Sequence, residues 1–336
     1  MPRIALKTHG LTKKYGETLA LDSVSLTLRE GDIYGLVGRN GAGKTTFFKC
    51  VMGLAKPTAG KVEISGESKD QGAARQHMGF MINPSFFPYL NPTENLEYFC
   101  RVKGIRIKGE VERLLGLVGL AGVKKPFKEF SLGMKQRLGV AGALLGSPPI
   151  VVLDEPINGL DPQGIIDMRG MIKDIHTQTG TTFIISSHIL SELDLVATQF
   201  GFIEKGVLVK EISHADLHEL TKKSLVIEVG DAAAALAILR PLGFENKADT
   251  LKPADMEAEA NGAKSVEAEA AEANGAKSAS NDITVHGNQL VLRSGIEHPN
   301  LIARALIEGG VEVYDLHRQE TTLEEYFMRL VGGLDD

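Results

Sequence analysis

The sequence predicts an α/β fold with a parallel sheet, followed by a smaller α+β domain. Apolar runs at 32–37, 150–153 and 182–185 are typical of buried strands, and stretches with helical apolar spacing lie between them. A glycine-rich segment at 38–45 joins the first of these strands to the start of a helix. After about residue 220 shorter strands and helices follow, which indicates a second domain.

Composition limits the classes of protein to which the chain can belong. Its 336 residues, 43% of them apolar, are enough for two domains with buried cores. The net charge of −6 argues against a nucleic-acid-binding surface. Two cysteines, Cys50 and Cys100, fit a reducing compartment without a disulfide framework. No run reaches the roughly 18 apolar residues of a membrane-spanning helix, and the N-terminus lacks the apolar core of a signal peptide. We therefore expect a soluble chain.

Residues 1 to about 30 are predicted to form strands, because apolar side chains alternate with polar ones along them. The next segment, Gly38 to Thr45, matches G-x-x-x-x-G-K-[ST] in full. Its glycines let backbone N–H groups point at phosphate oxygens beside a helix N-terminus. We expect Lys44 to reach the β- and γ-phosphates of a nucleoside triphosphate and Thr45 to bind Mg²⁺. The predicted nucleotide contacts are Gly38, Asn40, Gly41, Ala42, Gly43, Lys44, Thr45 and Thr46.

Two carboxylates, Asp154 and Glu155, follow the apolar run that starts at Ile150. A buried parallel strand that ends in carboxylates delivers them to a site at the edge of the sheet. Asp154 is expected to hold Mg²⁺ through water and Glu155 to polarise the attacking water. Alone, Asp-Glu-Pro is a common loop start, but together with the phosphate loop it becomes a strong signal.

Three further segments complete a family pattern. Phe130-Ser131-Leu132-Gly133-Met134-Lys135-Gln136-Arg137-Leu138 precedes the carboxylates, and Asn158-Gly159-Leu160-Asp161-Pro162 and Ser186-Ser187-His188 follow them. Over roughly the first 220 residues, this order resembles the ATP-binding subunits of ABC transporters. The resemblance implies an ABC-type P-loop ATPase domain with a RecA-like core, an antiparallel β subdomain and a helical subdomain at about 86–148. It also implies ATP and Mg²⁺ as cofactors.

The resemblance implies individual roles as well. In that family two nucleotide domains enclose two ATP molecules head to tail. Ser131 and the Gly133 backbone are then expected to contact the γ-phosphate held by the opposite subunit, with Asp161 at the dimer seam. His188 is expected to bond the γ-phosphate and Tyr15 to stack on adenine. The alternatives are a histidine packed in the core and a tyrosine packed on an edge strand.

The segment Phe130 to Leu138, which corresponds to the family's signature, departs from the usual signature pattern at Leu132 and Met134. With these residues it resembles the exporters of bacitracin-like and lantibiotic peptides and related ABC-2-type drug exporters. The Q-loop region, Met78 to Pro88, has no glutamine. Counting forward from Gly79 places the glutamine position at Asn83, whereas counting back from Pro88 places it at Ile82. Only Asn83 offers an oxygen to Mg²⁺ or water, so we assign the metal-site role to Asn83.

Within the helical subdomain, Thr93 is predicted to cap one helix, and residues 111–120 have the spacing of another. In the family this subdomain faces the membrane partner. Phe86, Phe87 and Tyr89 are candidates for the coupling surface, although aromatics so close together are more often core.

The accessory domain is predicted at 221–336. Its expected elements are strands at 225–229, 289–292 and 311–314 and helices at 232–239, 300–308 and 322–331. The last helix resembles the closing helix of ABC-2-type exporter subunits. A segment at about 246–282, rich in Ala, Glu, Asn, Gly, Lys and Ser, interrupts this domain and is expected to be a mobile insertion.

The leading hypothesis is the ATPase subunit of a two-component ABC exporter, peripheral on the inner face of the cell membrane. Its expected partners are a separate transmembrane permease and either a second copy or another ABC ATPase. One alternative is a soluble ABC ATPase that acts on nucleic acid or ribosomes. Against it stand the single phosphate loop, the lack of long heptad runs and the scarcity of cysteine. Another alternative, a nucleotide sensor without turnover, is disfavoured by the presence of Glu155.

Overall fold

A computed structural model describes residues 3–65, 75–76, 78–221, 223–242, 244–246, 281–292, 296, 298–319 and 322–332. The chain divides into two units, the first made of Met1–His218 and Leu323–Asp336 and the second of Glu219–Thr322. Most of the predicted insertion at 246–282 lies outside the described residues. Within the ranges that are described, none of the helices combines the length and apolarity needed to span a bilayer.

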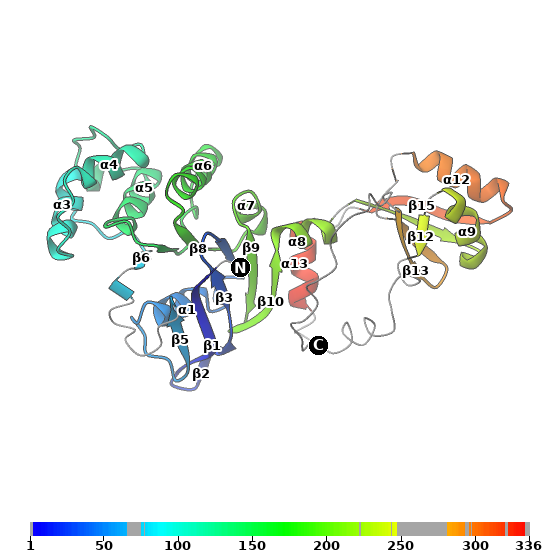
Figure 1. Cartoon of the computed structure of the whole chain (residues 1–336), viewed down its shortest axis with the longest axis horizontal. Coiled ribbons are helices and arrows are strands. Elements are labelled where there is room, and N and C mark those ends of the chain that lie inside the picture. The colour runs from blue at the N-terminus through cyan, green and yellow to red at the C-terminus, as the bar shows by residue number, and fades with distance from the viewer. Residues whose placement is uncertain are drawn as a thin grey trace. The chain divides into compact units, whose positions relative to one another are not determined.

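The first unit is built on the parallel sheet that the sequence predicts (Figure 1). Its described strands lie in the order β10-β9-β4-β8-β7-β6, all parallel except β10, which pairs antiparallel with β9. Every residue of β4, β7 and β8 is buried, as expected for strands covered on both faces. The strands are β4 (Ile33–Val37), β6 (Met78–Met81), β7 (Ile150–Leu153), β8 (Thr182–Ser187), β9 (Gln199–Glu204) and β10 (Val207–Ser213).

A second, antiparallel sheet contains the N-terminal strands. In it β1 pairs with β2, β3 and β5. Its alternating apolar side chains share a core with helix α1 and with β4 of the parallel sheet. The strands are β1 (Ile4–Tyr15), β2 (Thr18–Val24), β3 (Thr27–Arg29) and β5 (Ala59–Ile64).

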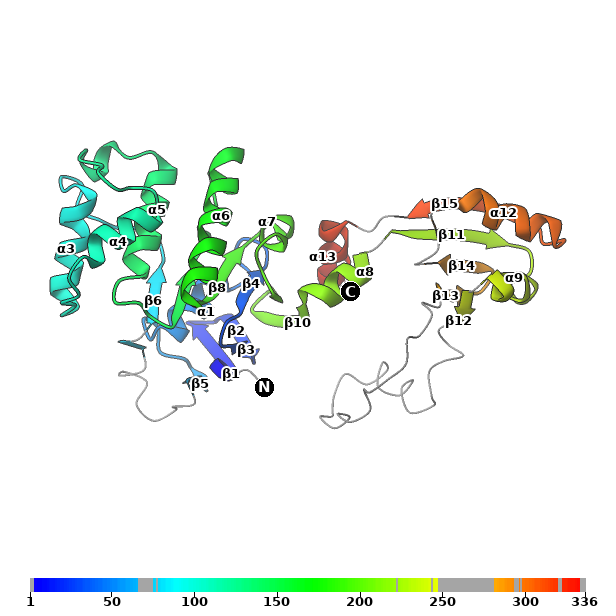
Figure 2. The same ribbon diagram turned by 45° about the horizontal axis from the view of Figure 1, so that its top comes forward.

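Helices complete the first unit. Three of them, α3, α4 and α5, gather where β6 forms the edge of the parallel sheet, in the region predicted to be helical (Figure 2). The helices are α1 (Lys44–Val51), α3 (Pro92–Val102), α4 (Glu110–Leu117), α5 (Leu132–Ala143), α6 (Pro162–Thr179), α7 (Leu190–Asp194), α8 (His214–Thr221) and α13 (Leu323–Gly332).

The start of α3 corrects one prediction. Asn91, not Thr93, caps this helix, because the Asn91 side chain accepts a hydrogen bond from Glu94 N at 3.0 Å. In return Glu94 Oε2 accepts one from Asn91 N at 2.8 Å, which completes a capping box. Pro92 occupies the first helical turn, where its missing N–H costs nothing.

The three aromatics near α3 have different environments. Phe86 is partly buried, with its ring centroid 5.5 Å from Phe99 and 5.4 Å from Phe127. Phe87 and Tyr89 are 42% and 78% exposed. The core interpretation is therefore correct for Phe86, whereas Phe87 and Tyr89 are available to a partner.

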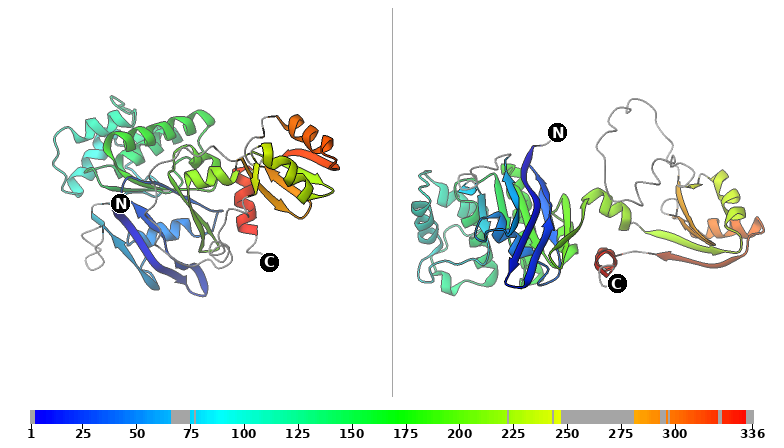
Figure 3. Two further views of the ribbon diagram at one scale, coloured as in Figure 1. Left: turned by 45° about the vertical axis from the view of Figure 1, so that its right-hand side comes forward. Right: turned by 90° about the horizontal axis from the view of Figure 1, so that it is seen from below.

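The second unit has its own sheet, in the order β12-β13-β14-β11-β15 (Figure 3). Alternate β11 residues, Leu225, Ile227 and Val229, share a core with helices α9 and α12. The strand expected at 311–314 begins later, as β15. The elements are β11 (Ser224–Val229), α9 (Ala232–Leu239), β12 (Phe244–Asn246), β13 (Asn281–His286), β14 (Gln289–Leu292), α12 (Pro299–Glu308) and β15 (Val313–Gln319).

The final helix, α13, differs from the prediction in its location. The sequence suggests that it closes the accessory domain, but its contacts place it in the first unit. The Phe327 ring stacks on Phe202 of β9 with centroids 5.7 Å apart. Glu324 Oε1 accepts a hydrogen bond from Ser191 N at 3.3 Å. Apolar packing against β9, which a local pattern does not reveal, explains the difference.

Candidate functional site

The phosphate loop has the conformation that its glycines require. It joins the end of β4 to α1, and Gly41 and Gly43 have φ angles of 85° and 111°, which disfavour any side chain. A Cβ on Gly38 would collide with the backbone carbonyl oxygen of Ile203. Gly38 therefore packs closely against the backbone of β9, and Ala42 is buried within the loop.

The loop lines a hollow of about 380 Å³. Five predicted residues, Asn40, Gly41, Gly43, Thr45 and Thr46, contribute to its wall, as do Lys44 and Glu155. The rest of the lining has no sequence signature: Arg39 occupies a variable position of the phosphate loop, and the other residues lie outside any motif. These remaining lining residues are Thr18, Leu19, Ala20, Arg39, Lys205 and Gly206.

Lys44 is the buried cation of this site and is only 6% exposed. Its Nζ donates to the Gly38 carbonyl oxygen at 2.6 Å and to that of Arg39 at 3.2 Å. It also lies 3.1 Å from Glu155 Oε1. The ammonium is therefore fixed inside the loop beside the carboxylate that follows β7.

Asp154 is held by two hydroxyl groups. Thr45 Oγ1 donates to Asp154 Oδ2 at 2.7 Å, and Ser186 Oγ donates to Asp154 Oδ1 at 2.7 Å. Ser186 Oγ also accepts a hydrogen bond from Glu155 N at 2.8 Å. A hydroxyl and a carboxylate meeting at the start of α1 are oxygen donors of the kind that Mg²⁺ prefers, so these residues fit that ion.

Glu155 and His188 also lie together. His188 Nδ1 is 2.9 Å from Glu155 Oε2. Glu155 has a φ angle of 50°, a left-handed conformation that is strained for a residue with a side chain and that often marks functional sites. Burial raises the pKa of the nearby Glu192 carboxyl, and the charge of His188 opposes this shift. Strands β4, β7 and β8 thus deliver Lys44, Asp154, Glu155 and His188 to one place.

The signature residues lie elsewhere in the unit. Ser131 caps α5, its side chain accepting a hydrogen bond from Met134 N at 3.3 Å. Asp161 caps α6 by accepting one from Gly164 N at 2.8 Å. Ser131, Gly133 and Asp161 line a second hollow of about 480 Å³ that shares no lining residue with the first. The structure therefore does not bring these three residues to Lys44 within one chain.

Neither Tyr15 nor Asn83 lines the hollow at the phosphate loop. Tyr15 ends β1, is 48% exposed and has Lys13 Nζ 4.6 Å from its ring centre. It pairs with Thr18, which lines the first hollow, although Tyr15 itself does not. Asn83 is exposed, with a φ angle of 55°, whereas Ile82 packs against the apolar core. Asn83 does not line the first hollow, and the assignment of a metal-site role to it stays a prediction.

Comparison with known proteins identifies the family. Residues 21–158 match the family model described as ABC transporter. The chain is 35% identical to the bacitracin transport ATP-binding protein BcrA of Bacillus licheniformis, over 98% of this chain and 97% of that protein. The chain belongs to the ABC transporter ATP-binding proteins. This ABC protein is also 37% identical to the lantibiotic transport ATP-binding protein SrtF of Streptococcus pyogenes, over 66% of its own length and 98% of that relative.

A solved structure supports the same assignment. The dimeric structure of MJ0796, a bacterial ABC transporter cassette, matches this ABC protein with a TM-score of 0.56 and 25% identity. The match covers 62% of this chain and 98% of that one. The predicted ABC ATPase fold and family are therefore confirmed.

Proposed function

We propose that the chain binds and hydrolyses ATP, dimerises on ATP and powers export through a separate transmembrane permease. The observation that carries the proposal is the network in which Lys44, Glu155 and His188 meet at the phosphate loop. The names of BcrA and SrtF favour peptide antibiotics as the exported class.

The residues of the network have complementary tasks. Lys44 and the N–H groups of the loop bind the phosphates, and the charge of Lys44 offsets that of the γ-phosphate. Glu155 accepts the proton of the attacking water, while His188 orients the carboxylate and the γ-phosphate. Thr45 and Asp154 would hold Mg²⁺. Asn83 is proposed as a further oxygen ligand, although it lines a different hollow from Thr45. When bound, this ion neutralises charge on the β- and γ-phosphate oxygens.

The second hollow gives the reason for a dimer. Ser131 and Gly133 lie at the start of α5, where unpaired backbone N–H groups favour an anion. Because they line a different hollow from Lys44, a γ-phosphate reaches them only from another subunit. The dimeric MJ0796 cassette supports this arrangement. Tyr15 is proposed to stack on adenine at the edge of the first hollow.

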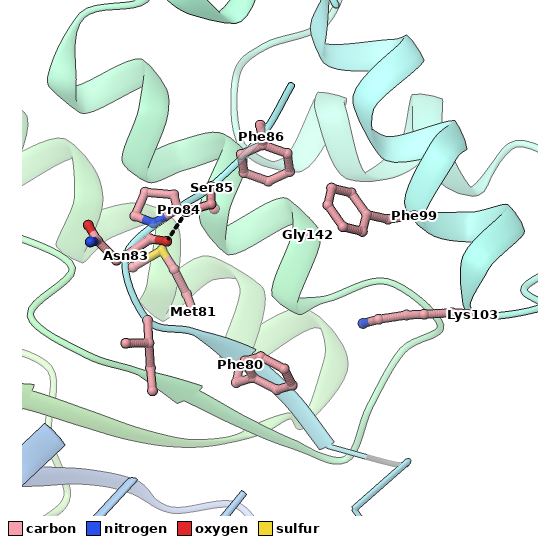
Figure 4. Close-up of a pocket in the computed structure, with 11 residues that line it drawn as sticks. Phe80, Met81, Asn83, Pro84, Ser85, Phe86, Phe99, Lys103 and Gly142 are labelled. Carbon is pink, nitrogen blue, oxygen red and sulfur yellow. Dashed lines mark hydrogen bonds between the residues drawn. The ribbon is translucent and has the colours of Figure 1, made fainter. Parts of the chain in front are cut away.

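A third hollow, of about 250 Å³, is proposed to receive the permease. Figure 4 shows Phe86 and Phe99 on one side of it, Phe80 on another and Lys103 at its edge, while Asn83 points away from the rings. Gly139 and Gly142 of α5 also line it; a Cβ on Gly142 would lie 3.1 Å from the Phe86 ring. An apolar segment suits this hollow, with the exposed Phe87 and Tyr89 nearby.

ATPase measurements test the proposal. The wild-type chain is expected to hydrolyse ATP only with Mg²⁺. Lys44→Ala is expected to weaken ATP binding at least about tenfold, because it removes charged hydrogen bonds. Lys14→Ala is a matched control, since Lys14 is an exposed lysine paired with Glu17. Absence of Mg²⁺-dependent turnover, even with a permease present, would favour a sensor. Stimulation by RNA or DNA instead of the permease would favour the nucleic-acid alternative.

Docking of the permease has a separate test. Tyr89→Ala in the full chain is expected to reduce co-purification with the permease and to leave the ATPase rate of the isolated chain unchanged. Tyr314→Ala, which changes a 62% exposed tyrosine in the second unit, is the control. Equal co-purification of both variants would place the docking surface elsewhere.

A further inference from the structure

A cluster of one carboxylate and two imidazoles lies outside the ATP site. Asp194 is the last residue of α7, His214 is the first residue of α8, and His218 lies four residues further along that helix. Residues four apart share one face of a helix, so both imidazoles face the same way. Figure 1 shows α7 and α8 next to each other, and all three residues belong to the first unit.

The three side chains are close enough to share one ion. His218 Nε2 lies 2.9 Å from Asp194 Oδ1 and 3.1 Å from Asp194 Oδ2, and His214 Nε2 lies 3.6 Å from Oδ1. The two imidazole rings are 4.4 Å apart between centroids. One ligand atom from each residue fits within 4.8 Å of the others. Both histidines therefore direct a nitrogen at the same carboxylate.

The surroundings fix this arrangement. Asp194 is only 8% exposed, so its carboxylate has little water to solvate it and requires nearby positive charge or hydrogen-bond donors. His214 stacks on Phe200 of β9, with centroids 6.3 Å apart and an angle of 23° between the rings. The two histidine side chains are 41% and 47% exposed, which gives an ion access from solvent.

We propose that Asp194, His214 and His218 form a binding site for a divalent transition metal ion of the Zn²⁺ class. Two imidazole nitrogens and one carboxylate oxygen are a common donor set for Zn²⁺, and a water molecule completes the tetrahedron. Imidazole ligands select Zn²⁺, Co²⁺ or Ni²⁺ over Mg²⁺ and Ca²⁺, which prefer oxygen. The site therefore discriminates against the Mg²⁺ that accompanies ATP.

Metal binding requires a change of tautomer in both histidines. In the structure His214 Nε2 donates a hydrogen bond to the backbone carbonyl oxygen of Asp194 at 3.0 Å. To bind an ion, Nε2 must give up this proton and Nδ1 must carry the ring proton instead. His218 Nε2, which donates to the Asp194 carboxylate, must likewise give up its proton, and His218 Nδ1 then carries the ring proton. The metal thus takes the place of the protons that now join the three groups.

An ion at this site would link two segments of the ATPase unit. Helix α7 follows β8, whose last residues precede His188, and α8 leads out of the unit at His218. A metal bound by both helices would fix α8 against the segment that follows the catalytic histidine. None of the three residues lines the hollow at the phosphate loop, so metal binding and ATPase activity can be measured independently.

Zn²⁺ titration of the untagged, chelator-treated full chain tests the proposal. Isothermal titration calorimetry in excess Mg²⁺, without nucleotide, is expected to show one Zn²⁺ per chain, and Co²⁺ is expected to give the intense visible absorption of a tetrahedral site. His218→Gln is expected to weaken Zn²⁺ binding at least ~100-fold, since even outer-shell changes cost about 10–100-fold. Asp194→Asn is also expected to weaken Zn²⁺ binding.

His317→Gln is the matched control, because His317 also contacts a carboxylate, Asp315, at 2.7 Å but does not belong to the cluster. This variant is expected to bind Zn²⁺ as the wild type does. His218 is nearly half exposed and glutamine keeps an N–H donor for Asp194, so His218→Gln is expected to keep the wild-type melting temperature in the presence of chelator. Failure of the wild-type chain to bind Zn²⁺, or unchanged binding by His218→Gln, would overturn the proposal.

Discussion

Replacing Ser186 by alanine tests how the two carboxylates are held. Ser186 is fully buried, donates to Asp154 Oδ1 at 2.7 Å and accepts from Glu155 N at 2.8 Å. A hydrogen bond to a charged group contributes about 1.5–3 kcal/mol, and a buried N–H left without a partner costs about 1–3 kcal/mol. Because the two effects overlap, we expect Ser186→Ala to lower the free energy of unfolding by about 3 kcal/mol.

The neighbouring Ser187 is the matched control. It is equally buried, but its Oγ only accepts a hydrogen bond from Ile189 N at 3.0 Å and touches neither carboxylate. Ser187→Ala is therefore expected to cost about 1 kcal/mol. Urea unfolding of the full chain measures both costs, and steady-state assays measure ATPase activity. We expect a loss of turnover of about tenfold or more for Ser186→Ala alone, because Glu155 loses its backbone anchor. Equal effects of the two variants on stability and on rate would refute this reasoning.

Three other changes have defined outcomes. Asn91→Ala is expected to cost about 1 kcal/mol in urea unfolding, since it removes the cap of α3, whereas Thr93→Ala is expected to cost less; the reverse order would contradict the capping box. Burial, followed by the charge of Glu211, raises the pKa of Tyr34, so the folded state favours the neutral phenol and loses stability as pH rises above about 10. Tyr34→Phe is expected to reduce that alkaline loss, and thermal melts of both chains at a series of pH values would show it as a shallower slope. Ser131→Ala is expected to lower ATPase activity with little change in ATP affinity of the monomer, measured by calorimetry; a large loss of affinity would place Ser131 in its own subunit's site.

The grouping of the candidate site residues was predictable because its signals are local and its strands are parallel. Lys44, Asp154, Glu155 and His188 each come after a buried strand, and the carboxyl ends of parallel strands meet at one edge of the sheet. Ser186 was overlooked as a supporting residue because a serine in a strand has no signature of its own. Only its contacts with Asp154 and Glu155 reveal its place.

The other differences have identifiable causes. The sequence predicts Thr93 as the cap of α3, but Pro92 and Glu94 occupy the helical positions that favour Asn91 as the cap. The helix α13 was predicted as a helix, but its packing on Phe202 depends on distant parts of the chain. Periodicity predicts that an element forms and does not predict its packing partner.

The central claim is that ATP closes two copies of this chain around the site of Glu155. Light scattering after size exclusion of Glu155→Gln, with and without ATP, tests it most directly, because this change removes the base and keeps the phosphate loop. We predict a dimer with ATP, a monomer without it, and a monomer under both conditions when Lys44→Ala is added. Wild-type turnover by Glu155→Gln, or a monomer with ATP bound, would contradict the account.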